Sequence, residues 1–264
     1  MLRYLIIILD SSAPSFCHYP SSGEGEWMSE DILRQAVRFA QCNALMVNVL
    51  VGNRPIPVEL LEELDKINHI FIGPAPATED SVWDMTVIEG IEALRHFESN
   101  EDKNVIFRCS RSELAEFCAE YAQQSGRFAR LNVILSDLQK FDDADLALCR
   151  NADYFRTDGP DPVSRSCEAG VRHITVAPDG HFYICPAFFY DRIYPDCGAL
   201  PGDPEIPDGE LLNLEHAPLC RSCDARHCRR CVYLNLKTTR EINTPSRRQC
   251  LSVRETDPFD TYEK

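Results

Sequence analysis

The sequence predicts an α/β protein with a cysteine-rich C-terminal part, and three observations support this. Apolar strand-like runs and amphipathic helices alternate about every thirty residues through the first 150 residues. Eight of the 13 cysteines fall between Cys167 and Cys250. Near residues 157–160 the composition changes, and turns, cysteines and prolines become frequent. We therefore expect two domains, residues 1–156 and residues 157–264.

The N-terminal part is expected to contain at least five strands, each followed by a helix. The expected strands are residues 5–9, 45–51, 69–72, 105–107 and 132–135, with a sixth beginning at 154–155. The expected helices are a run capped by Ser29, then 57–67, 82–97, 110–124 and 143–148. This alternation implies right-handed βαβ units and a parallel sheet. A partial (β/α) barrel and a doubly wound sheet both satisfy it.

Composition limits the partners and the location of the chain. The formal net charge is -15, and such a surface repels phosphate backbones, so we expect no nucleic-acid partner. No apolar run is long enough to span a bilayer, and no signal peptide is recognisable. We therefore expect a cytoplasmic protein without a membrane partner. Because the cytosol keeps thiols reduced, a disulfide framework is the weaker explanation of the cysteines.

The first cysteine element surrounds an expected β-hairpin. Cys167 is followed after twelve residues by Gly180, and Cys185 follows after four more. Residues 173–177 and 181–184 flank a Pro-Asp-Gly turn, which predicts two antiparallel strands. Gly180 would supply the positive φ of the turn. The hairpin would return Cys185 to the neighbourhood of Cys167.

The second cysteine element is Cys220-x2-Cys223-x4-Cys228-x2-Cys231, and Cys250 follows after eighteen residues. Four thiols within twelve residues indicate metal or cluster binding rather than core packing. Zinc is the competing interpretation, since two Cys-x2-Cys pairs can make a tetrahedral site. Zinc ribbons usually separate the pairs by a dozen or more residues, and dense cysteine runs are more typical of iron-sulfur clusters.

This pattern resembles the SPASM domain, the auxiliary-cluster domain of radical S-adenosylmethionine enzymes that modify peptides. All seven cysteines have a counterpart, although the middle spacings are x4 and x2 where the family has x5 and x3. The resemblance implies two 4Fe-4S clusters. The first would be held by Cys167, Cys185 and Cys231, with Cys149, Cys197 or no protein residue as fourth ligand. The second would be held by Cys220, Cys223, Cys228 and Cys250.

The N-terminal part resembles a radical S-adenosylmethionine barrel that has lost its catalytic motif. Such enzymes carry Cys-x3-Cys-x2-Cys after the first strand, where this chain has Asp10, Pro14 and Cys17. One thiol cannot hold a three-ligand cluster. The second strand of these enzymes ends in Gly-Gly-Glu-Pro, and here Arg54 replaces the acid. We therefore do not expect S-adenosylmethionine to bind.

The whole chain resembles the CXXX repeat peptide maturase family. The resemblance rests on the opening strand followed by Asp10, the Ser-Phe-Cys-His-Tyr stretch at 15–19, the length and the cysteine-rich end. It implies a role in maturing a ribosomally made peptide beside a true radical S-adenosylmethionine enzyme. We expect an accessory protein that binds the precursor peptide or that enzyme, or relays electrons.

Two alternatives stay open at this point. One is a structural zinc module for protein interaction. The other is an independent, non-radical peptide-modifying enzyme using Asp10, Cys17 and His18 at the end of the first strand; no catalytic residue is assigned. Four arginines lie among the cysteines of the second element, between Cys220 and Cys231: Arg221, Arg226, Arg229 and Arg230. They would stabilise anionic clusters, bind an acidic partner or act as solvated charges.

Overall fold

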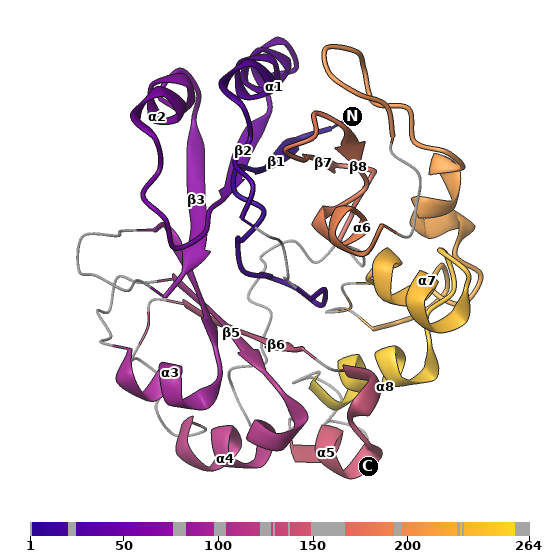
Figure 1. The fold of residues 1–264 in the computed structure, drawn as a ribbon. Helices are drawn as coiled ribbons and strands as arrows, with labels where there is room; N and C mark the ends of the chain where they lie inside the picture. Colours follow the sequence, from indigo (N-terminus) through magenta and orange to yellow (C-terminus); the bar gives the residue numbers. More distant parts are fainter. Residues whose placement is uncertain are drawn as a thin grey trace. The chain divides into compact units, whose positions relative to one another are not determined.

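The computed structural model describes residues 2–20, 25–75, 83–97, 104–121, 128, 130–136, 138–148, 167–192, 197–225, 228 and 230–256. The chain forms two compact units, each assembled from separate stretches (Figure 1). The first unit comprises Met1–Ser15, Tyr19–Val87 and Glu168–Gly209. The second unit comprises Phe16–His18, Ile88–Cys167 and Glu210–Lys264.

A mostly parallel sheet forms the first unit, with the described strands in the order β4-β3-β2-β1-β7-β8. The described strands of this unit pair parallel, except that β7 and β8 pair antiparallel. β4 begins in this unit and pairs with β3 through Val87. The strands are β1 (Tyr4–Ile8), β2 (Met46–Leu50), β3 (His69–Pro74), β4 (Met85–Glu89), β7 (His173–Val176) and β8 (Phe182–Tyr183).

The strand β1 lies in the middle of this sheet. Leu5 faces Val47 of β2 on one side and Ile174 of β7 on the other. Leu5, Ile7 and Ile8 are fully buried, as expected for a parallel strand covered on both faces. The predicted first two strands are thus confirmed to within a residue at each end.

Three helices accompany this sheet: α1 (Glu30–Cys42), α2 (Val58–Leu64) and α6 (Pro186–Asp191). Ser29 is the N-cap of α1, and its hydroxyl accepts a hydrogen bond from Ile32 N at 3.3 Å, as the sequence predicted. The helices α1 and α2 lie side by side (Figure 1). In element order α1 comes after β1 and α2 after β2, so they complete the expected βα units.

One predicted helix is wrong. Residues 82–97 were expected to be helical, but β4 occupies Met85–Glu89 and the helix α3 covers only Ile91–His96. The β-branched residues Thr86, Val87 and Ile88 favour a strand. Gly90 then has φ +86°, a conformation that interrupts any continuous helix. β3 also extends through Gly73 and Pro74, where the sequence predicted its end.

The predicted hairpin is confirmed. Thr175 pairs with Tyr183 and Val176 pairs with Phe182, and Gly180 has φ +81° in the turn. The sequence did not predict that the first hairpin strand joins the main sheet by pairing parallel with β1. The predicted boundary at 156/157 and the predicted sixth strand lie outside the described residues, so both stay predictions.

The second unit contains two parallel strands, β5 (Asn104–Cys109) and β6 (Arg130–Leu135), paired over six residues. Helices α3, α4 (Arg111–Tyr121) and α5 (Asp143–Leu148) flank these strands (Figure 1). α5 contacts α8. The C-terminal helices are α7 (Val232–Thr239) and α8 (Arg247–Thr256), and short 3-10 turns occupy η1 (Leu138–Lys140), η4 (Gly209–Leu212) and η5 (Leu214–His216).

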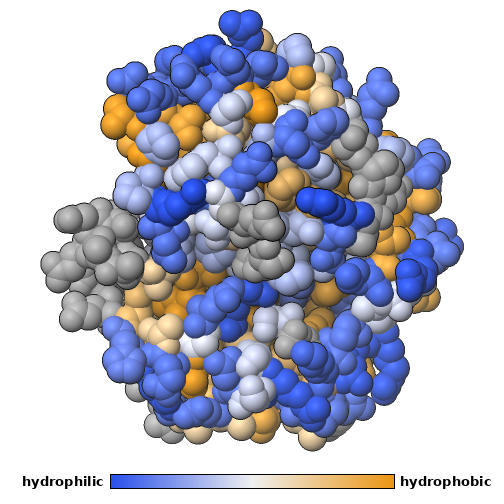
Figure 2. All heavy atoms as spheres, viewed as in Figure 1, coloured by the Kyte–Doolittle hydropathy of each residue, from blue (hydrophilic) through white to orange (hydrophobic). Residues whose placement is uncertain are grey.

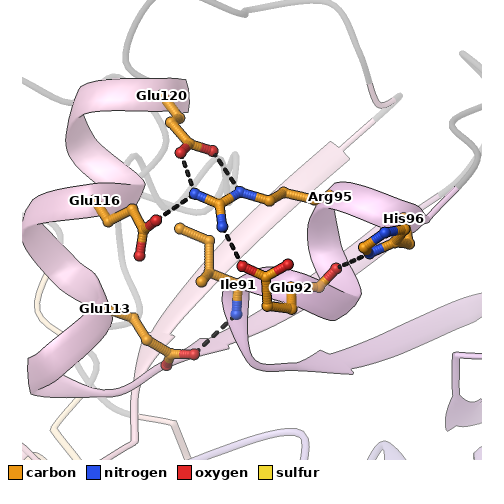
Figure 3. Close-up of polar contacts among 7 residues, drawn as sticks. All are labelled: Ile91, Glu92, Arg95, His96, Glu113, Glu116 and Glu120. Atoms are coloured by element: carbon orange, nitrogen blue, oxygen red, sulfur yellow. Dashed lines mark hydrogen bonds and ion pairs between the residues drawn. The ribbon is translucent and has the colours of Figure 1, made fainter.

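A polar network ties α3 to α4 in the second unit (Figure 3). Arg95 of α3 donates to Glu92 on its own helix and to Glu116 and Glu120 on α4. The α3 start is fixed separately, because Ile91 N donates to Glu113 at 2.8 Å. Glu113 also accepts from the backbone N and the hydroxyl of Ser110, which fixes the start of α4.

The surface is mostly hydrophilic on the face shown in Figure 2. A hydrophobic patch lies over α2, where Val58 is 63% exposed. Among the described residues, no helix is both long and apolar enough to cross a bilayer.

Acidification should destabilise the second unit through Glu113 and Glu120. Burial opposes ionisation of Glu113, but hydrogen bonds from Ser110 and the backbone N of Ile91 hold its pKa below the ordinary 4.5. The hydrogen bond from Arg95 lowers the pKa of Glu120. A carboxyl with a lowered folded pKa contributes stability above the unfolded pKa and loses it as pH falls through the folded pKa. Urea midpoints should therefore be constant near neutral pH and fall below about pH 4.5.

The variant Glu113→Gln tests this assignment. It should lower the midpoint at neutral pH and flatten the acid branch, whereas Glu62→Gln, on the exposed face of α2, should leave the profile unchanged. An acid branch in Glu113→Gln as steep as that of the unmodified chain would contradict the assignment.

Candidate metal centre

Four of the predicted ligand cysteines line one pocket in the second unit: Cys220, Cys223, Cys228 and Cys250. Successive tight turns place the first two, because Cys220 N donates to Ala217 O at 3.0 Å and Cys223 N donates to Cys220 O at 3.1 Å. Cys250 comes from the first turns of α8. These four are the residues that the resemblance assigns to the second cluster. Their role as ligands stays a proposal.

The rest of the pocket wall is largely apolar and includes Leu219, Ala225, Pro245 and Val253. Burial, together with the neighbouring thiols Cys220, Cys250 and Cys223, raises the pKa of the Cys228 thiol to about 12. Burial also raises the pKa of Cys220. Gathering thiols here is therefore unfavourable for their charged form unless a cation compensates. A bound metal supplies that compensation, because a coordinating thiol is deprotonated outright.

The donor set fits an iron-sulfur cluster. All four groups are thiols, which are the ligands of 4Fe-4S clusters. Among the described residues, no three His, Cys, Asp or Glu side chains converge closely enough to hold a single metal ion. The ligands of a cluster need no such convergence, because the iron-sulfide cube stands between them. When bound, such a cluster would supply one-electron chemistry or an iron site for a thiolate.

The cysteines assigned to the first cluster are divided between the two units. In the second unit, Cys167 N donates to Arg230 O at 3.2 Å, next in sequence to the buried Cys231. In the first unit, Cys185 is the N-cap of α6. Cys197 is 1% exposed, and its N donates to Phe182 O at 2.7 Å beside β8. Cys149 lies outside the described residues. The composition of this ligand set stays a prediction.

A second arrangement lies at the carboxyl end of β1 in the first unit. The side chain of Asp10 is fully buried, and its carboxylate accepts from Arg54 Nη2 at 2.9 Å and from Arg54 Nε at 3.2 Å. Ser12 N also donates to Asp10 at 2.9 Å. Arg54 further donates to Gly25 O and lies 4.8 Å from the Trp27 ring centroid. The two residues form a fork-shaped, charge-assisted pair.

Gly52 makes room for this pair. A Cβ at this position would lie 2.2 Å from Ser12 Oγ and 2.6 Å from Asp10 Oδ2. Only glycine lets β2 end so close to the carboxylate. The glycine and both charged residues therefore form one local arrangement at the ends of β1 and β2.

The two places where the chain departs from the radical-enzyme motifs thus compensate each other. Asp10 stands where the first motif cysteine is expected, and Arg54 stands where the acid of the second motif is expected. In the sequence alone, these two replacements look like separate losses. The signal that could have linked them is their opposite charge at the carboxyl ends of adjacent strands, which meet at one sheet edge.

Of the remaining first-loop residues, Pro14 is buried in the first unit, while Cys17 and His18 belong to the second. Burial lowers the pKa of His18 to about 4, with Leu135 O opposing and the charge of Arg108 assisting. His18 Nδ1 lies 3.3 Å from Leu135 O. This contact orients the His18 ring, and the alternative of an enzyme using Asp10, Cys17 and His18 stays a prediction.

Comparison with solved structures shows the fold. The chain is similar to Streptococcus suis SuiB bound to S-adenosylmethionine, at a TM-score of 0.54 and 15% identity, covering 94% of this chain and 77% of that one. It is also similar to anSMEcpe with bound AdoMet and the Cp18Cys peptide, at a TM-score of 0.56 and 11% identity, covering 97% and 95%. No family model and no curated protein matches the sequence. The fold is of the radical S-adenosylmethionine type.

Removing Arg54 should destabilise the chain more than removing a comparable surface arginine. Arg54→Ala leaves the buried Asp10 carboxylate without its cation, and we expect a loss of about 2–3 kcal/mol of unfolding free energy. Arg34 has a matching exposure of 47%, but it bonds Glu30 and Asp31, which are 47% and 83% exposed. Arg34→Ala should cost about 1 kcal/mol or less.

Urea unfolding at neutral pH measures both variants. Glu63, a third and longer contact of Arg34 at 3.6 Å, keeps Lys66 as a partner in the control. Equal losses of unfolding free energy in the two variants would show that the Asp10–Arg54 pair stabilises the chain no more than an exposed ion pair does.

Proposed function

We propose that this chain is an iron-sulfur protein of ribosomally synthesised peptide maturation. It acts as an accessory protein beside a true radical S-adenosylmethionine enzyme, and its substrate is a CXXX repeat peptide. Its clusters relay electrons or coordinate a substrate thiolate, and the chain binds the precursor peptide or the partner enzyme.

The observation that carries this proposal is the gathering of Cys220, Cys223, Cys228 and Cys250 in one apolar pocket. A thiol-only donor set in a low-dielectric site is the environment of an iron-sulfur centre. Because burial raises the pKa values of Cys220 and Cys228, a bound cluster would have to displace the thiol protons and compensate the thiolate charge.

The accessory role is supported by the Asp10–Arg54 pair. An ion pair joins the side chains that replace two motif residues of the radical enzymes. Asp10 and Pro14 stand at two of the three cysteine positions, so only Cys17 remains where three cysteines are needed. Of the similar solved structures, SuiB has also been determined with the precursor peptide SuiA, at a TM-score of 0.50. This likeness supports a peptide as the partner of the present chain.

Metal content provides the first test. Anaerobically purified protein should contain iron and sulfide in equal amounts, roughly eight of each if both clusters assemble. Cys228→Ala removes a pocket thiol whose pKa is raised to about 12, mainly by burial. It should lower the iron and the sulfide content by about half. Cys42→Ala is the matched control, because Cys42 is exposed at the end of α1, and it should change neither.

The outcomes separate the candidate functions. Zinc without sulfide would replace the electron-relay proposal with a structural zinc module. Iron and sulfide that survive in Cys228→Ala would remove this pocket from the ligand set. Absorption and electron paramagnetic resonance spectra of the same samples identify the cluster type.

Partner binding provides a second test. The cluster-loaded chain, immobilised anaerobically, should retain a synthetic peptide with cysteine at every fourth residue. If a substrate thiolate coordinates iron, the serine-substituted peptide should bind at least tenfold more weakly. Retention of neither the peptide nor a radical S-adenosylmethionine maturase would overturn the accessory role. Modification of the peptide by this chain alone, abolished in Cys17→Ala, would favour the independent enzyme.

A further inference from the structure

Arg230 is the largest fully buried side chain of the described residues, at 1% exposure. Its Nη2 donates to Leu212 O, and its own backbone O accepts from Cys167 N at 3.2 Å. Nε and Nη1 are also buried and have no hydrogen-bond partner among the described residues. A buried guanidinium with two unused donor nitrogens is destabilising unless an acceptor completes it.

The surroundings of Arg230 indicate what that acceptor is. Its side chain lines the pocket that contains Cys220, Cys223, Cys228 and Cys250. Four thiols act electrostatically on its guanidinium: Cys220, Cys167, Cys228 and Cys231. No carboxylate forms an ion pair with Arg230 among the described residues, so thiols are the only anion-forming groups shown to act on this buried cation.

Arg221 is the other described arginine between Cys220 and Cys231, and its environment differs from that of Arg230. Arg221 lies on the turn that carries Cys220 and Cys223, but it is exposed to water. A solvated arginine is screened and contributes little to a site. Of the interpretations offered for these arginines, cluster stabilisation therefore fits Arg230, and a solvated surface charge fits Arg221.

We propose that Arg230 is the cationic positioning residue of the cysteine cluster site, donating its Nε–H and Nη1–H groups to cluster or thiolate sulfur. The inference rests on the proposed iron-sulfur function and adds a residue to it. Hydrogen bonds to sulfur and nearby positive charge both stabilise the reduced, more negative cluster, and so raise its reduction potential. Because residues of both predicted ligand sets surround Arg230, its charge acts on both.

A purely structural role is the competing explanation. In that case Arg230 would only hold η4 in place through Leu212 O. The loss of this bond would lower stability but would leave the potential of an assembled cluster unchanged. The potential therefore distinguishes the two roles, whereas folding and iron content do not.

The experiment compares Arg230→Gln, Arg230→Lys and the control Arg221→Gln by redox titration monitored with electron paramagnetic resonance. Arg230→Gln should assemble a cluster with a clearly lower potential. Arg230→Lys keeps the charge and should show a smaller decrease. Arg221→Gln, with the same formal charge change on an exposed side chain, should match the unmodified chain.

A measurement on the unmodified sequence guards against variants that fail to fold. Protein labelled with ¹⁵N-arginine should show ¹⁵N hyperfine coupling to the reduced cluster, and Arg230→Lys should lose it. Absence of this coupling in the unmodified chain overturns the role of Arg230, as does a potential in Arg230→Gln equal to that in Arg221→Gln. Absence of iron and sulfide from the unmodified chain would instead overturn the proposed function itself, and this inference with it.

Discussion

The need to compensate buried charge governs both arrangements described in this chain. At the end of β1, the fully buried Asp10 carboxylate is matched by the fork of Arg54. In the cysteine pocket, thiols are concentrated among apolar side chains, where ionisation is costly without a cation. The first arrangement is complete within the chain. In the second, the proposed iron-sulfur cluster would supply the compensating charge, so the pocket and not the ion pair is the candidate functional site.

The central position of β1 explains how the first arrangement is built. β1 pairs with β2 on one side and β7 on the other, so its carboxyl end is fixed by two neighbours and Asp10 follows directly. β2 ends at the same edge, and Gly52 allows its backbone to approach the carboxylate. Ligand sites of parallel sheets are found at this edge. Here the Asp10–Arg54 ion pair lies at this edge.

Much of the fold was predictable, because its elements follow local rules. The buried run of β1, the Ser29 cap of α1 and the Pro-Asp-Gly hairpin each depend on neighbouring residues, and each is confirmed. The helix expected at 82–97 failed because Gly90 divides a short strand from a short helix, and weak periodicity over so few residues does not separate the two. The parallel pairing of β1 with β7 joins segments about 170 residues apart, and no local pattern encodes it.

The candidate site divides in the same way. Cysteine spacing indicated a shared metal, and the SPASM resemblance implied that Cys220, Cys223 and Cys228 form one set with Cys250. These four cysteines do line one pocket. Spacing could not show which of the arginines among these cysteines is buried, because sequence position carries no information on burial. Only the packing of Arg230 against Leu212 O, with Nε and Nη1 left unpaired, separates it from the exposed Arg221. A cysteine motif thus points to candidate ligands, whereas the burial and the unpaired donors of Arg230 are found only from its contacts.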